Sequence, residues 1–579
     1  MAEEQVQRSE AEPGARRTFL RRHRWMVWTA ASALVFLTVL TAVLTVLARH
    51  VEPYLRARII EGLSQRFHAH VDLDQFHISV RHGQEAEWGL WATGRGLRIG
   101  RPDSAHESGA APLVQLQEFR FHVPLRYAQT QSLYIPEIVL NGLLVHIPPR
   151  ARADQRGSFT SAMATPPASP SADRTLANVR IGRVLVEKAQ LVIESSKPDK
   201  PPMVFDIAKV KLSHVTAGKP VDFVADLTNP SPRGDIHTAG SFGPWDREDP
   251  GASPMNGSYQ FKDADLSTIK DIAGTLQSTG TYKGVLGSLH VNGTAHVPDF
   301  QLTQYKNALP LTAQFQAIVD GTDGDTWLDH VDATLGTAHF VTLGKVIRIR
   351  VDQNGKPAAG SAVTSSPPQA GHIIDLSVNI AGTPVDDFLR LVSHTPTPIL
   401  SGDVVAKAML HIPPGHIPVP QRIKIDGSFQ LEDVRFSDPR LQQKLQDLSL
   451  RGLGHPDAAK SGDASDLRSQ MQGDFHLANA VITLPNLDYS VPGCEVRLKG
   501  TYALSGALHF DGNARMQATL SHLVGGWKGF LLKPADPFFK KDGAGTLIPI
   551  KVRGTRQSPE FGVDVGRIGH THPMPPARQ

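Results

Sequence analysis

The stretch HIIDLSVNI, residues 372–380, alternates apolar and polar side chains along its length. Successive side chains of an extended backbone point to opposite faces, so the alternate apolar residues of this stretch share one face. They are Ile374, Leu376, Val378 and Ile380. VIRIRV (346–351) and IPIKVRG (548–554) repeat the alternation, with Ile548 and Ile550 on the apolar face of the latter. Gly, Asn-Gly and Asp-Gly punctuation between such stretches predicts antiparallel strands with one apolar and one polar face.

A ten-residue phrase occurs twice, as VNGTAHVPDF at 291–300 and as VRGTRQSPEF at 552–561. Both fit V-x-G-T-x-x-x-P-[D/E]-F and neither contains a catalytic signature. We expect the strand to reach a turn at Gly-Thr and the proline to interrupt the ladder before the chain re-enters at the phenylalanine. The phrase therefore indicates the boundary of a repeated sheet module.

Helices are few in this sequence. Residues 53–67 have apolar side chains every fourth position, and DPRLQQKLQDLSL (438–450) combines an Asp N-cap, a Pro at the first turn and a leucine stripe. DADLSTIKDIAG (263–274) and PVDDFLRLVS (384–393) are expected to form single short helices between strands.

The N-terminal part predicts a membrane anchor. Residues 25–48 carry no charge, and 24 helical residues would reach about 36 Å, enough to cross a hydrocarbon core of about 30 Å. Five arginines cluster at residues 16–24, directly before this segment, and fewer follow it, which favours a cytoplasmic N-terminus. The expected interface anchors are Arg21, Arg22, Arg24, Trp25 and Trp28. A cleaved signal peptide fits less well because the segment is long and LTVLARH is a poor cleavage site.

Composition argues against several classes of function. Sixty Lys and Arg residues face 56 Asp and Glu residues, which leaves no basic face suited to nucleic acid. The chain has no GxSxG, P-loop, strand-linked GxGxxG or HExxH motif, so we expect no enzyme activity and no cofactor. A single cysteine, Cys494, excludes an intramolecular disulfide and is expected to be a semi-buried strand residue, not a reactive thiol.

Two groups of residues were weighed as metal ligands. The pairs His68/His70 and His570/His572 lack a third ligand nearby in the sequence, so they are expected to be ordinary surface histidines. Residues 320–332 contain Asp320, Asp323 and Asp325, but their spacing misses the calcium-loop pattern. A hairpin turn explains the same acidic residues, and no metal is expected.

The apolar strand faces allow two interpretations. Either each sheet closes over its own core as a sandwich, or the apolar face stays open as a groove for acyl chains. Covering helices are scarce and the strands do not cluster into compact domains, which favours the groove. Its expected lining includes the six apolar residues already named in 374–380 and 548–550.

The order of motifs resembles the AsmA-like family. The stretch PYLRARIIEGLSQRFHAHVDLDQFHISV (53–80) is similar to the family's beginning, and residues 264–300 are similar to its repeated Asp-Leu-Ser and Gly-rich strand pairs. Residues 473–504 and 545–565 resemble the AsmA-like C-terminal domain. The matching positions there are Gly473, Asn479, Pro492, Gly493, Gly500, Tyr502, Pro549, Gly554, Pro559 and Phe561.

This resemblance implies an inner-membrane protein with a periplasmic body. The fold class it implies is mostly β, with an N-terminal transmembrane helix, then an elongated, twisted, largely antiparallel sheet folded into an open apolar groove with few short helices. The chain is shorter than the family's longest members, so spanning the periplasm would require self-association or an envelope protein partner. The expected organisation is 1–24 basic tail, 25–48 transmembrane helix, 49–150 AsmA-like helix and strands, 151–175 linker, 176–351 central β repeats, 352–371 loop, 372–565 AsmA-like C-terminal domain and 566–579 tail.

The leading functional hypothesis is accommodation or transfer of phospholipid acyl chains during outer-membrane biogenesis, with membrane lipids as partners. The alternative is a structural or assembly factor for outer-membrane proteins that acts through exposed strand edges. An anchored hydrolase or adhesin is disfavoured by the lack of a catalytic constellation.

Overall fold

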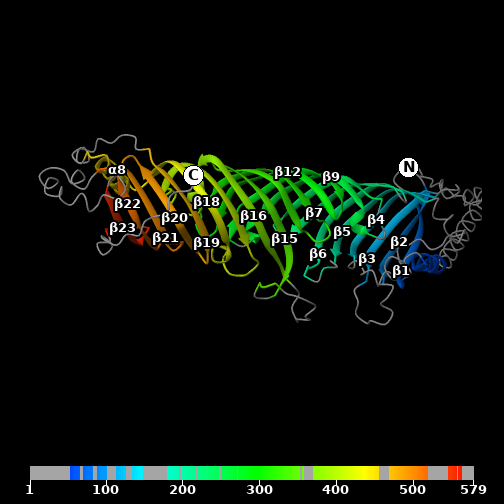
Figure 1. Ribbon diagram of the computed structural model, residues 1–579. Helices are drawn as coiled ribbons and strands as arrows, with labels where there is room; N and C mark the ends of the chain where they lie inside the picture. Colours follow the sequence, from blue (N-terminus) through cyan, green and yellow to red (C-terminus); the bar gives the residue numbers. More distant parts are fainter. Residues whose placement is uncertain are drawn as a thin grey trace, which may run out of the picture.

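A single elongated 24-stranded sheet forms the body of the protein in the computed structural model. Colours from blue to red progress along its length, with β1 and β2 near one end and β22 and β23 at the other (Figure 1). The structure describes residues 52–65, 69–82, 88–100, 112–124, 133–147, 179–352, 355–357, 369–455, 468–518 and 546–563, less a few loop positions.

The strands follow one another in space in the order of the sequence. The first are β1 Val71–His82, β2 Trp88–Ile99, β3 Val114–Pro124, β4 Leu133–Ile147, β5 Val179–Ile193, β6 Met203–Val215, β7 Val221–Pro230 and β8 Arg233–Phe242. The central strands are β9 Pro254–Asp265, β10 Ile272–Ala273, β11 Thr275–Val285, β12 Ser288–Leu302, β13 Leu309–Val319, β14 Thr326–Leu335 and β15 Ala338–Val351. The last are β16 Gln369–Pro384, β17 Leu400–Ile412, β18 Lys424–Phe436, β19 Gln470–Ala478, β20 Val481–Val491, β21 Cys494–Ala503, β22 Leu508–Met516, β23 Thr546–Thr555 and β24 Ser558–Val563.

Almost all neighbouring strands are antiparallel, as the alternation of the sequence predicted. β4 and β5 form the exception, a parallel pair that requires a longer crossover than a hairpin. The short strand β10 pairs with β12 beside the main ladder of β9, β11 and β12. Residues 352–371 connect β15 and β16, which pair directly, so this segment interrupts a hairpin and not the sheet.

The helical elements are short and lie at the strand ends. Besides a helix over residues 52–65, they are α6 Asp386–Leu391, α7 Val419–Arg422, α8 Pro439–Gly452, η2 Pro250–Ala252 and η3 Leu266–Thr268. Two of the predicted helices are confirmed as α6 and α8. The predicted helix over 263–274 is wrong. Asp265 accepts a hydrogen bond from the Ser267 N–H and caps a single 3-10 turn, after which Ile272 and Ala273 join the sheet.

The helix over residues 52–65 packs on the first strands and covers their free edge. Ile59, Ile60 and Leu63 contact the buried clusters around Val71 and Leu73. At the outer edge of β1, Glu52 Oε1 accepts the Ile78 N–H at 3.0 Å, and Arg56 Nε donates to the Leu73 carbonyl at 2.9 Å. Backbone groups that would otherwise be open for pairing are therefore occupied.

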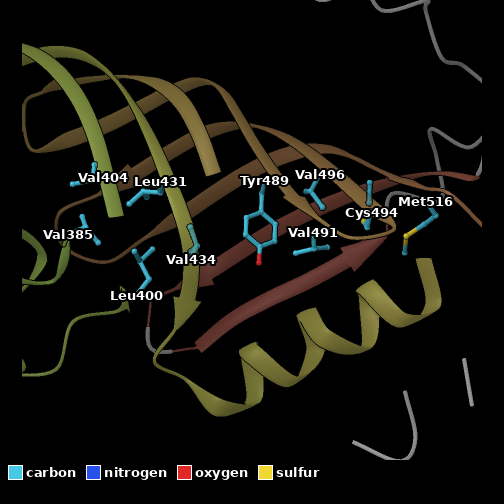
Figure 2. Packing of buried hydrophobic residues seen from close by; sticks show 11 residues of the cluster. Val385, Leu400, Val404, Leu431, Val434, Tyr489, Val491, Cys494, Val496 and Met516 are labelled. Atoms are coloured by element: carbon cyan, nitrogen blue, oxygen red, sulfur yellow. The ribbon is translucent and has the colours of Figure 1, made fainter. Parts of the chain in front are cut away.

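At the other end, α8 covers a larger group of buried side chains, which we name the C-terminal cluster (Figure 2). It comprises Val385, Leu400, Val404, Leu431, Val434, Tyr489, Val491, Cys494, Val496, Ala514 and Met516. Leu445 and Leu448 of α8 pack against it. Asp438 starts α8 by accepting the Arg440 N–H at 2.8 Å, as the sequence predicted. Each fully buried Val, Leu or Met side chain contributes about 1.5–3 kcal/mol, so this cluster fixes the end of the sheet.

The repeated phrase folds in two different ways. At 552–561 the chain turns after Gly554, whose φ is +89°, and Pro559 pairs opposite it in β24. At 291–300 the expected turn is wrong, because Gly293 and Thr294 lie in the middle of β12. There the ladder is disturbed only by a register shift between Val297 and Phe300, around the proline.

None of the helices among the described residues has the length and apolar character that a membrane crossing requires. The predicted transmembrane segment 25–48, its tail 1–24 and the C-terminal tail 566–579 lie outside the described residues.

Candidate functional site

The strongest candidate site is the apolar face of the sheet, which we name the inner face. It is set by register, because residues directly opposite one another on neighbouring strands share a face. Tyr282 on β11 lies opposite Val291 on β12, which lies opposite Ala317 on β13. Further along, Phe315 lies opposite Val331 on β14. One apolar face therefore continues from strand to strand without a change of side.

Side chains of the inner face remain partly exposed in the central strands. On β9, Met255, Tyr259 and Phe261 are half-buried, whereas the residues between them, such as Asn256 and Gln260, are exposed. The other half-buried apolar residues of this face include Leu276, Leu289, Val291, Leu311, Phe315, Leu328, Val331, Phe340 and Val346. A closed sandwich core would bury such residues almost completely.

Within the described residues, the clusters of fully buried apolar side chains lie at the two ends of the sheet. Two of them are built on β1–β4 and two on the strands from β16 onward. Strands β5–β15 contribute no side chain to these clusters. Among the described elements, α6 is the helix that lies against the central inner face, and its Phe388 ring lies 5.8 Å from that of Phe340 on β15, so most of this face is an apolar surface without a covering helix.

Two glycines lie between two aromatic residues in one row across the central strands. Tyr259 is opposite Gly280, Gly280 is opposite Gly293, and Gly293 is opposite Phe315. A Cβ atom on Gly293 would approach Tyr259 Oη to 2.7 Å and Phe315 Cζ to 2.8 Å, so the two rings lie over the glycine. Because glycine has no side chain, the rings of Tyr259 and Phe315 can lie close to the backbone, and the inner face does not protrude at this point.

Polar groups on the inner face are paired with one another. The hydroxyls of Tyr282 and Thr238 are 2.7 Å apart, and those of Tyr259 and Ser278 are 3.1 Å apart. Burial raises the pKa of both tyrosines, so they stay neutral. The inner face therefore carries no charge at these positions and presents little unsatisfied polarity to an apolar ligand.

Residues predicted to line the site divide into two groups. Ile374, Leu376 and Val378 lie on β16, opposite Val346, Gly344 and Thr342 of β15, and are half-buried on the inner face. Ile380, Ile548 and Ile550 pack instead against the C-terminal cluster. The central aromatic residues of β9–β13 were not selected from the sequence, although their period-two alternation was the available signal.

The inner face is the concave face, because the sheet coils. Consecutive connections of an antiparallel meander lie alternately on its two long edges. The first edge carries the β5–β6 and β9–β11 connections and α6, and the second carries the β13–β14, β17–β18 and β23–β24 connections. Loops of the first edge contact loops of the second edge many strands further along. Inside the coil, Ile380 of β16 and Ile548 of β23 reach the same cluster.

Three contacts between the two edges occur among the described residues. Lys197 and Lys200 after β5 bind Asp323 and Asp325 between β13 and β14. Asp271 beside β10 accepts the Val419 N–H of α7 at 2.6 Å. After α6, Ser393 Oγ accepts a hydrogen bond from Arg556 Nη2 at 3.0 Å, in the β23–β24 turn.

The first of these contacts is a buried network of charges. The side chains of Lys200 and Asp325 are 3% and 5% exposed, and Lys200 also donates to the Arg348 carbonyl at 2.6 Å. The Arg348 guanidinium donates to the carbonyls of Pro201 and Pro202 at 3.0 and 2.9 Å. The hydrogen bond to Asp323 raises the pKa of Lys197, while burial lowers the pKa of Arg348.

The candidate metal ligands take other roles. Asp320, Asp323 and Asp325 lie in the β13–β14 turn, where Asp320 binds Thr322 and the other two bind lysines. His70 Nε2 lies 3.1 Å from Asp72, while His68, His570 and His572 lie outside the described residues. No group of three or more His, Cys, Asp or Glu side chains suited to a metal ion occurs in the described part of the chain.

Cys494 and the predicted interface anchors complete the set of expected positions. The thiol is fully buried in the C-terminal cluster, more deeply than the expected semi-buried position, and burial raises its pKa to about 12. Arg21, Arg22, Arg24, Trp25 and Trp28 lie outside the described residues.

Comparison with known proteins adds no relative from which a role could be carried over. No protein-family model, no curated protein and no solved structure matches this chain. A functional interpretation therefore depends on the geometry of the inner face and on the sequence motifs.

Proposed function

We propose that this protein is an inner-membrane-anchored periplasmic protein of envelope and outer-membrane biogenesis, without enzyme activity. Its inner face would be an open apolar groove that accommodates or transfers the acyl chains of phospholipids. One observation carries the proposal: most large apolar side chains of the concave face, such as Tyr259, Phe315 and Val331, stay only half-buried in β9–β15, between two ends that are packed.

The driving force is the removal of acyl CH₂ groups from water. Each buried CH₂ contributes about 0.8 kcal/mol, and the headgroup stays hydrated at the opening between the two edges. Because the inner face is apolar on successive strands, an acyl chain that moves along the coil exchanges its contacts with one strand for contacts with the next. Lipid could then move along the coil without leaving an apolar surface.

The membrane placement comes from the sequence. The uncharged segment 25–48 would anchor the protein, and the arginines before it favour a cytoplasmic N-terminus with the sheet on the periplasmic side. The resemblance to the AsmA-like family supports the same placement and the same class of cargo.

The test compares two neighbouring residues of β13 that face opposite sides. Phe315 lies on the half-buried inner face and Gln316 on the exposed outer face. Native mass spectrometry of the detergent-purified full chain should detect bound phospholipid in the wild type and in Gln316→Asp. Phe315→Asp should lose most of it, because a carboxylate must be desolvated beside an acyl chain.

Thermal unfolding of both variants serves as the control for folding. Lipid loss in Phe315→Asp with a melting temperature close to that of Gln316→Asp supports the groove. Absence of phospholipid from the wild-type protein would overturn the proposal, as would equal lipid occupancy in both variants.

A second candidate function rests on the unequal ends of the sheet. The edge of β1 is occupied by Glu52 and Arg56, whereas β24 pairs only with β23 among the described strands. An assembly factor for outer-membrane proteins could pair a client strand with β24. Photo-crosslinking from position 560 to a defined envelope protein, together with absence of bound lipid, would favour this function over lipid handling.

A further inference from the structure

The two long edges of the coiled sheet are joined by the network of Lys197, Lys200, Asp323, Asp325 and Arg348, which we name the latch. The two lysines belong to the β5–β6 connection, and the carboxylates belong to the β13–β14 turn. More than 120 residues of sequence separate each ion pair. The latch therefore closes the opening of the coil at this point.

This closure has a direct consequence for an amphiphilic cargo. A phospholipid that keeps its acyl chains on the inner face must hold its headgroup in the opening between the two edges. The latch crosses that opening with charged side chains and with the backbone of residues 200–202. A headgroup moving along the coil would meet it.

We propose that the latch is a gate that opens to let lipid headgroups pass along the coil. This inference rests on the proposed lipid-handling function and adds to it a defined point of control. The cargo it assigns is an amphiphile with a hydrated headgroup, since a purely apolar molecule inside the coil would not need the latch to open.

The chemistry of the latch suits a contact that opens. Burying two ions costs desolvation that largely offsets their attraction, so on opening each ion recovers its hydration. An apolar plug of the same size would instead expose its surface to water. Arg350 also favours opening, because its buried Nε has no hydrogen-bond partner in the closed latch. Its Nη2 donates to the Lys200 carbonyl at 3.2 Å.

Opening would not disturb the sheet. The latch lies outside the strand ladders β5–β6 and β13–β14, whose registers end at Ile193/Met203 and Val319/Thr326. On β15 it uses the N–H and carbonyl of Arg348, beyond the last pairing of β15 with β14, so the β15–β16 ladder remains when the latch opens. The other edge contacts are single hydrogen bonds, from Val419 to Asp271 and from Arg556 to Ser393.

The test locks the latch covalently in the full chain. Lys197→Cys, at an exposed position, combined with Asp320→Cys in the facing β13–β14 turn is joined by a cleavable bismaleimide, and the native Cys494 does not compete because it is buried. The matched control joins Lys345→Cys to Asp375→Cys. That Lys–Asp pair, at 3.6 Å, links the neighbouring strands β15 and β16 without crossing the opening.

The readout is transfer of a fluorescent phosphatidylethanolamine from phosphatidylethanolamine/phosphatidylglycerol vesicles holding the protein to protein-free vesicles of the same lipids. Crosslinking the latch should reduce transfer to the protein-free background, and cleavage of the crosslinker should restore it. The crosslinked control should transfer lipid at the wild-type rate.

The outcomes separate the gate from the proposed function. Undiminished transfer through the crosslinked latch would overturn the gate while leaving lipid handling intact. Absence of both bound lipid and transfer in the wild-type protein would overturn lipid handling itself. Equal loss of transfer in the latch and control crosslinks would also overturn the gate, because general stiffening of the sheet would then explain the effect.

Discussion

Two single residues on the inner side of the coil can be tested directly, one for its chemical reactivity and one for its steric surroundings. Cys494 is surrounded by apolar side chains, and burial raises the pKa of its thiol to about 12. Gly293 is placed where two aromatic rings leave no room for a Cβ atom. Each residue gives a prediction that can be measured without knowing the ligand.

The thiol of Cys494 should resist alkylation in the native protein. A thiolate is the reactive form, and the folded protein keeps this group neutral and covered. Modification by a maleimide at pH 7.5 should be absent from the folded chain and complete in denaturant, as measured by intact mass. Rapid modification of the native protein would contradict the packed C-terminal cluster.

The same pKa shift makes stability depend on alkaline pH. The folded pKa of about 12 exceeds the ordinary value of 9.0, so the unfolded chain loses its proton first. The contribution of the thiol is fully present below pH 9 and declines as the pH rises toward 12. Cys494→Ala should remove this part of the decline in denaturant titrations between pH 8 and 10.

Gly293→Ala should destabilise the central sheet. Its Cβ would lie 2.7 and 2.8 Å from the outermost ring atoms of Tyr259 and Phe315 and 3.0 Å from the Thr279 carbonyl oxygen, so both rings must move aside, which we expect to cost about 1 kcal/mol. Gly562→Ala is the matched control, since nothing lies within 4 Å of its Cβ position. Chemical denaturation of the two variants should separate them, and equal midpoints would argue against the ring-over-glycine packing.

At the scale of elements, local sequence patterns predicted correctly those strands and helices whose formation depends on local interactions. The alternation in 372–380 correctly gave β16, and the Asp-Pro start with a leucine stripe correctly gave α8. The helix expected at 263–274 failed because β9 continues to Asp265, and after a single 3-10 turn Ile269 returns to extended backbone and Ile272 pairs with Leu302 of β12. The turn expected within 291–300 failed because both neighbours of β12 hold Gly293 in the ladder.

The N-cap of α8 provides the prediction at this scale. Asp438→Ala removes the acceptor for the Arg440 N–H and should cost about 1 kcal/mol of stability. Gln443→Ala, on the exposed side of the same helix, should have little effect. Thermal unfolding compares the two, and a smaller loss for Asp438→Ala than for Gln443→Ala would show that α8 does not depend on this cap.

At the scale of the whole molecule, the coil includes contacts between residues far apart in the sequence, which no local sequence pattern predicts. The inner face could be inferred from period-two alternation, and Ile374, Leu376 and Val378 of β16 lie on it, while their contact with lipid stays a prediction. The latch could not, because Lys200 and Asp325 meet only when the sheet has curved through many strands. Their charges were visible in the sequence, but the acidic turn alone suggested a hairpin or a calcium loop.

The covered edge of β1 sets a limit on assembly. A sheet with two free edges can be extended by copy after copy, edge to edge, into a filament. Here Glu52 and Arg56 already occupy the backbone groups that an incoming strand would need. Glu52 accepts the Ile78 N–H and Arg56 donates to the Leu73 carbonyl, so a second copy that added a strand at β1 would first have to displace these two contacts.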